Sequence, residues 1–134
     1  MIFSRVVLGL VGALYVGFGV WGLWAPAAVT AMTEIQLTTP TAVTDGRAVY
    51  GGLTAGLGVL FLLAAVRRAD VWTGLVALFL TLVFPVAARL LGIALDGGGT
   101  PATFKVMQGE LLFLALSGVA LVRERNRPVE APGT

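Results

Sequence analysis

The chain has 134 residues, of which 57% are hydrophobic and 12% are charged, and its formal net charge is +2. Soluble domains carry about 25% charged residues, so this composition excludes a soluble domain and favours one helical membrane domain. The chain contains no cysteine and no histidine. Disulfide bonds, thiolate nucleophiles and histidine-bound metal or haem are therefore excluded, and we expect no cofactor. The few basic residues lie mostly at helix ends, so no nucleic-acid partner is expected.

The first apolar run, at about residues 3–24, predicts a membrane-spanning helix, which needs roughly 20 apolar residues. Trp21 and Trp24 close the run and suit the headgroup level of a bilayer. A cleaved signal peptide is the alternative, because small residues follow at Ala25-Pro26-Ala27. The run is longer than the apolar region of most signal peptides, so we expect a retained helix.

Residues 25–46 form the longest connection, and their many threonines predict an ordered outer loop or lid. Pro26 favours a short interfacial helix, since proline is tolerated in a first helical turn. The second span is predicted at about residues 47–66, and its first residues are polar. Either Thr44 or Asp45 is expected to cap it, by accepting from backbone N–H groups that have no partner within the helix.

Small residues recur at every fourth position in both of these spans. The two stripes are Gly9, Ala13 and Gly17 in the first span, and Ala48, Gly52 and Gly56 in the second. Helices can approach closely along such stripes. We therefore expect the first two spans to pack through them, with a homodimer face as the alternative.

The third span is predicted at about residues 71–95, with a kink at Pro85, and the fourth at about residues 104–122. Between them, the glycine-rich segment 96–103 is a second outer loop. A polar cytoplasmic tail follows at residues 123–134. The fold class is thus all-α: a single membrane-embedded four-helix bundle that occupies residues 1–134.

Positive charge gathers at one end of the predicted bundle. That end holds Arg5, Arg67, Arg68, Arg123, Arg125 and Arg127, whereas Arg47 and Lys105 lie at the other. Cytoplasmic segments of membrane proteins carry an excess of lysine and arginine. Both termini are therefore expected to be cytoplasmic, in a multi-pass protein of the bacterial cytoplasmic membrane.

Ionisable residues inside the apolar spans are the main chemical signal. At about 1.5 Å per residue, Arg89 and Glu110 each lie about 10 Å from the outer end of their helices. An arginine within a membrane helix costs about 2.5–3.5 kcal/mol, so it should face the bundle and be paired. A bidentate bridge between Arg89 and Glu110 satisfies both groups. Arg47, paired with Asp45, Asp96 or Glu110, and the Tyr50 hydroxyl extend it into a buried polar cluster.

This predicted cluster, Asp45, Arg47, Tyr50, Arg89, Asp96 and Glu110, has two interpretations. It can serve only to fix which helices are neighbours, or it can also border a functional cavity. A cation site built from Glu34, Asp45, Asp96 and Glu110 is disfavoured by the nearby arginines, so no metal is expected. No nucleophile–base pair and no cofactor motif occurs, so no catalytic residue is assigned.

Four short motifs carry a resemblance to a known family. They are Asp-Gly-Arg-x-x-Tyr-Gly-Gly at residues 45–52, Gly-Leu-Gly at 56–58, Arg-x-x-Gly-x-x-x-Asp-Gly at 89–97, and Glu110 early in the last span. In these the chain resembles small bacterial four-helix membrane proteins catalogued as a domain of unknown function, and more loosely the DoxX-type proteins. The resemblance implies four helices and a role for Arg47, Tyr50, Arg89, Asp96 and Glu110. It implies no reaction.

Three functions follow as hypotheses. The first is a non-catalytic protein whose cavity near the outer face holds a membrane lipid or small amphiphile, with Arg47 and Arg89 at its head group. The second is a structural or accessory subunit of a homo-oligomer or larger membrane complex. The third is a small proton-coupled transporter with Glu110 as proton carrier, which is disfavoured because pairing with arginine keeps a carboxylate ionised.

Overall fold

A computed structural model describes residues 1–126, which form helices and short connections without a strand. Four helical segments in this part of the chain are long and apolar enough to cross a membrane: Ile2–Trp24, Pro40–Val66, Arg68–Asp96 and Pro101–Arg125. The predicted all-α, four-helix class is therefore confirmed. Most of the expected tail, residues 127–134, lies outside the described residues.

The first and last of these segments are single helices, α1 (Ile2–Trp24) and α6 (Pro101–Arg125). The second is composite: α3 (Pro40–Gly46) runs into a π-helix, η1 (Arg47–Leu53), and then into α4 (Thr54–Val66). The third joins a 3₁₀ turn, η2 (Arg68–Asp70), to α5 (Val71–Asp96), which continues through Pro85. The short helix α2 (Pro26–Ala31) begins at Pro26, where the sequence predicts an interfacial helix.

The second segment begins earlier than the sequence analysis expects. Its N-cap is Thr39, whose hydroxyl accepts from the Ala42 N–H at 3.1 Å, and Pro40 occupies the first helical position. Threonine before proline is a strong start signal, because the cap satisfies a free donor and proline has none to satisfy. The expectation that Thr44 or Asp45 caps this segment is therefore wrong, because both lie inside α3.

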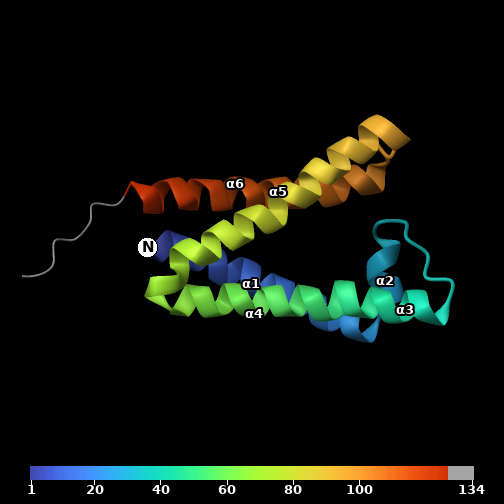
Figure 1. The fold of residues 1–134 in the computed structure, drawn as a ribbon, viewed down its shortest axis with the longest axis horizontal. Coiled ribbons are helices and arrows are strands. Elements are labelled where there is room, and N and C mark those ends of the chain that lie inside the picture. The colour runs from blue at the N-terminus through green and yellow to red at the C-terminus, as the bar shows by residue number, and fades with distance from the viewer. Residues whose placement is uncertain (127–134) are drawn as a thin grey trace, which may run out of the picture.

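The helices pack as two pairs, α1 with η1 and α4, and α5 with α6 (Figure 1). Glycines hold the first pair together. A Cβ added to Gly19 would lie 2.7 Å from the Ala55 Cα, and one added to Gly22 would lie 2.6 Å from the Tyr50 carbonyl carbon. A Cβ added to Gly58 would lie equally close to α1, at 2.6 Å from the Val16 nitrogen. The two backbones therefore touch where no side chain intervenes.

The first two spans pack closely, as expected, but mostly through different glycines from those predicted. Of the predicted glycines only Gly9 meets α4, where an added Cβ would lie 4.0 Å from the Ala65 Cβ. Gly17, Gly52 and Gly56 are exposed, and a Cβ on any of them would meet nothing within 4 Å. Both helices carry small residues on two faces. The positions of the bulky residues determine which of these faces packs against the other helix. Leu8 and Val11 of α1 are buried in the core, which turns Gly12, Gly19 and Gly22 toward η1 and α4.

The hydrophobic core fills only one half of the bundle. Its fully buried residues include Leu8 and Val11 near the start of α1, Phe61 near the end of α4, and Leu75 and Leu78 in the first half of α5. This half contains the start of α1, the end of α4, the start of α5 and the end of α6 (Figure 1). The other half, where α5 ends and α6 begins, has no comparable core among the described residues.

Candidate functional site

A cavity of about 610 Å³ occupies the half of the bundle that lacks the core. Residues from α1, α2, η1, α4, α5 and α6 line it, together with the segment that follows α2. Its apolar lining residues are Leu14, Phe18, Val29, Met32, Val106 and Gly109. Its polar lining residues are Tyr15, Thr33, Tyr50, Thr54, Arg89, Lys105 and Glu110. Polar and apolar groups thus face the same space, which lies within the range of roughly 300–1,000 Å³ typical of small-molecule sites.

Arg89 and Glu110 form a bidentate ion pair in the cavity lining. Arg89 Nε donates to Glu110 Oε2 at 2.9 Å, and Nη2 donates to Oε1 at 3.0 Å. This is the pairing that the sequence predicts between the third and fourth long helices. The two planar groups meet fork to fork, which fixes the relative orientation of α5 and α6 at this level.

The pair is not buried, in contrast to the sequence-based expectation. The Arg89 side chain is 29% exposed and that of Glu110 is 19% exposed. The buried polar side chains among the described residues are Ser4, Thr30 and Ser117, none of them charged. The cause is the missing core in this half, which leaves both groups on a cavity wall instead of enclosing them.

The structure brings together three of the six predicted cluster residues, Tyr50, Arg89 and Glu110, at the cavity. Arg47 turns to α1 instead, where its guanidinium donates to the Leu23 carbonyl oxygen. Asp45 and Asp96 are exposed, and neither they nor Arg47 join an ion pair within residues 1–126. The expectation of one network through all six residues is therefore wrong.

The π-helix explains why Arg47 and Tyr50 separate. A π-helix has wider turns than an α-helix, so residues three apart point in more divergent directions. Within η1, Tyr50 lines the cavity while Arg47 lies against the end of α1. Directly after η1, the Thr54 hydroxyl donates to the Val49 carbonyl oxygen at 3.1 Å. π-helical turns occur often at functional sites, which agrees with the position of η1 on the cavity wall.

Lys105 is the charged residue of the cavity lining that the predicted cluster does not include. It is exposed, lines the cavity and makes no ion pair among the described residues. Lys105 and Gly109 are four positions apart along α6 and share one face of the helix. Glu110, five positions from Lys105, lies about 140° round the helix from it, so spacing along α6 alone does not place Lys105 beside Glu110.

The segment that follows α2 closes one side of the cavity. Met32 and Thr33 line the cavity, and Glu34 has a positive φ of 62°. The Glu34 carboxylate accepts a hydrogen bond from the Thr100 hydroxyl at 3.4 Å, which links this segment to the start of α6. The threonine-rich loop therefore covers the cavity from the α2 side.

No group of three or more metal-ligating side chains gathers in the described part of the chain.

Comparison with known families matches residues 3–121 to a model described as Domain of unknown function (DUF4345). The chain belongs to the DUF4345 family. The match runs from α1 to α6 and so includes all four long helices and the cavity. It confirms the resemblance to a domain of unknown function, while the likeness to DoxX proteins and a bacterial origin stay predictions. No curated protein and no solved structure matches the chain.

Proposed function

We propose that this protein is a non-catalytic integral membrane protein that holds a small amphiphile in the cavity beside Arg89 and Glu110. One observation carries the proposal: the lining of a single cavity combines charged and hydroxyl-bearing side chains with apolar ones. The cavity lies in a chain with four helices of membrane-spanning length. A ligand with a polar head and an apolar tail can contact both kinds of lining residue, whereas a purely polar or purely apolar ligand matches only one kind.

The head group that this cavity favours is anionic. Arg89 and Lys105 give the cavity two positive charges, and Glu110 gives it one negative charge, so the balance is +1. Arg89 is already engaged by Glu110, which leaves the Lys105 ammonium as the cation without a protein partner among the described residues. The Tyr50 and Thr54 hydroxyls add hydrogen-bonding groups to the cavity lining. Lys105 thus takes the role that the sequence analysis gave to Arg47.

The tail of the ligand would lie against the apolar lining residues. Leu14 and Phe18 of α1 line the cavity together with Val29 of α2 and Met32. The aromatic ring of Phe18 offers a large apolar contact area, and the flexible side chain of Met32 can adapt to the shape of a ligand. A single-chain amphiphile suits these residues better than a compact polar metabolite.

We place the cavity in the outer half of a bacterial cytoplasmic membrane, with both termini on the cytoplasmic side. Charge asymmetry supports this orientation. The core end of the bundle carries Arg5, Arg67, Arg68, Arg123 and Arg125 against Asp70 and Glu124. Within residues 1–126, the cavity end carries only two basic residues outside the Arg89–Glu110 pair, Arg47 and Lys105, against the acids Glu34, Asp45 and Asp96. Lysine and arginine accumulate on the cytoplasmic side of membrane proteins.

The test is binding of dodecanoate, with dodecyl glucoside as an uncharged comparison, to the protein in nanodiscs. We expect dodecanoate to bind more tightly, and Lys105→Gln to weaken it by roughly fivefold, the loss of about 1 kcal/mol. Gly109→Leu should abolish binding of both compounds, because Gly109 lines the cavity and a Cβ there meets nothing within 4 Å.

Two control variants separate the cavity from the rest of the surface. Arg47→Gln removes a charge at the same end of the bundle but outside the cavity. Gly17→Leu adds the same bulk on an exposed helix face that is also outside it. Neither should change binding. If dodecanoate binds equally well to the Gly109→Leu protein, the cavity is not its site and the proposal is wrong.

A second candidate function, a subunit of a membrane complex, is favoured by the exposed stripe of Gly52 and Gly56. Both glycines face open space on the outer side of the second helical segment, together with exposed Ala48. Another transmembrane helix could lie there backbone to backbone. The test is the mass of the protein after mild extraction from its host membrane, with Gly56→Leu as the interface variant. A lone monomer in the unaltered protein would exclude this function.

A further inference from the structure

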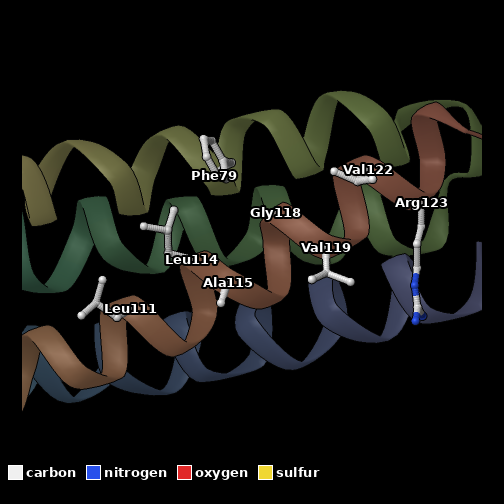
Figure 2. Close-up of a pocket in the computed structure, with 8 residues that line it drawn as sticks. All are labelled: Phe79, Leu111, Leu114, Ala115, Gly118, Val119, Val122 and Arg123. Carbon is white, nitrogen blue, oxygen red and sulfur yellow. The ribbon is translucent and has the colours of Figure 1, made fainter.

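A second cavity, separate from the first, runs along the outside of α6 in the core half of the bundle. It is a shallow groove of about 750 Å³. Figure 2 shows its lining, with Phe79 of α5 on one side and Leu111, Ala115, Gly118 and Val122 along α6. Arg123 lies at one end of the groove and extends toward α1, and it is the one charged residue of the lining.

The groove has the length of a lipid chain within one leaflet. From Leu111 to Val122 it follows twelve residues of α6, whose eleven steps of about 1.5 Å span roughly 16 Å. Half of the bilayer's hydrocarbon core measures about 15 Å. Gly118 leaves room at the middle of the groove, where an added Cβ would come no closer than 3.6 Å to the Phe79 ring.

Positive charge surrounds the Arg123 end. The Arg123 guanidinium carbon lies 4.6 Å from the centre of the Phe3 ring, and the Arg5 Nε donates to the Ala65 carbonyl oxygen at 2.6 Å. These contacts join the start of α1 to the ends of α6 and α4. Five arginines therefore lie at this end, Arg5, Arg67, Arg68, Arg123 and Arg125, against two acids, Asp70 and Glu124. Such clusters attract anionic lipid head groups.

We propose that this groove binds one acyl chain of an anionic phospholipid, with the lipid phosphate at Arg123. Charge complementarity selects the lipid over a second copy of the chain. A copy related by a twofold axis along the membrane normal would place its own Arg123 at the same depth, and the like charges would repel. A phosphate brings the opposite charge to the same place. The inference does not depend on the amphiphile cavity, which lies in the other half of the bundle.

Native mass spectrometry of the full chain, released from micelles that contain palmitoyl-oleoyl phosphatidylglycerol or the matching phosphatidylcholine, tests the proposal. One measurement reports both bound lipid and oligomeric state. We expect one phosphatidylglycerol to stay bound to the monomer, and phosphatidylcholine to be retained several-fold less. Arg123→Gln should lower retention of phosphatidylglycerol by roughly fivefold, because it removes the charge nearest the phosphate.

Two further variants test the groove itself. Gly118→Leu fills its middle and should abolish retention, whereas Gly118→Ala adds only an ordinary contact with Phe79 and should retain lipid. Arg68→Gln is the matched charge control, since Arg68 is exposed at the same end and does not line the groove. It should behave like the unaltered protein. Equal retention of both lipids, equal loss in Arg68→Gln and Arg123→Gln, full retention in Gly118→Leu, or a dimer without lipid would each overturn the proposal.

Discussion

Arg89 and Glu110 are 21 positions apart in the sequence, yet their side chains meet through two parallel hydrogen bonds of 2.9 and 3.0 Å. The contact joins α5 to α6 in the half of the bundle where no hydrophobic core does so. Both groups also face the cavity. The same pair therefore serves two purposes: it holds two helices together, and it sets the charge that a ligand would meet.

The first prediction concerns the coupling between these two residues. Arg89→Gln and Glu110→Gln should each lower the free energy of unfolding by about 1–3 kcal/mol, because each leaves its partner charged and unpaired. The double variant should recover part of that loss. The measurement is unfolding in mixed micelles titrated with sodium dodecyl sulfate, analysed as a double-mutant cycle. Strictly additive losses would show that the two side chains do not stabilise each other.

The Arg89–Glu110 contact could be predicted from sequence because two independent arguments converge on it. Both residues lie at the same depth in neighbouring spans, and each needs an opposite charge in an apolar setting. No such argument predicts the partner of Arg47. This residue lies near the start of the second helical segment, where its side chain can reach water or the end of α1. Its actual partner, the Leu23 carbonyl oxygen, follows from the π-helix, and no pattern in the sequence indicates a π-turn at residues 47–53.

Glycines show a different limit of sequence analysis. Small residues at every fourth position suggested one packing face on α1, and the structure uses another that includes Gly19 and Gly22. A glycine-rich helix has several narrow faces, so the choice depends on where the large residues of the whole bundle find space. That is a property of tertiary packing. The start of the second helical segment, in contrast, could have been predicted locally from Thr39 and Pro40.

The second prediction follows from this packing face. Gly19→Ala and Gly22→Ala should each lower the free energy of unfolding by about 1–3 kcal/mol, because the new methyl group overlaps the backbone of the neighbouring helix. Gly17→Ala is the matched control on the same helix. Its methyl group meets nothing within 4 Å, so it should be neutral or stabilising by up to about 1 kcal/mol. Equal losses at Gly17 and Gly19 would contradict the observed pairing of α1 with α4.

The third prediction uses the two positive φ angles on the cavity side of the bundle. Glu34 has φ of 62° and Gly97, which ends α5, has φ of 68°. A left-handed conformation costs an ordinary residue about 1–2 kcal/mol and costs glycine almost nothing. Glu34→Gly should therefore raise the thermal stability, since its 3.4 Å contact with Thr100 is exposed and weak. Gly97→Ala should lower the stability by a similar amount. Thermal unfolding in detergent measures both changes. A shift of the melting temperature in the same direction for both variants would contradict the prediction.

The fourth prediction concerns orientation, and the lack of native cysteine makes it simple to test. Thr38→Cys places a thiol in the exposed loop on the cavity side, and Ala69→Cys places one in the exposed turn between α4 and α5. Because the arginine-rich end should remain in the cytoplasm, a membrane-impermeant maleimide should label only Thr38→Cys in intact cells. Both variants should react once the membrane is opened, which shows that both thiols are accessible. Labelling of Ala69→Cys alone in intact cells would mean that the arginine-rich end faces outward, and the cavity would then open toward the cytoplasm.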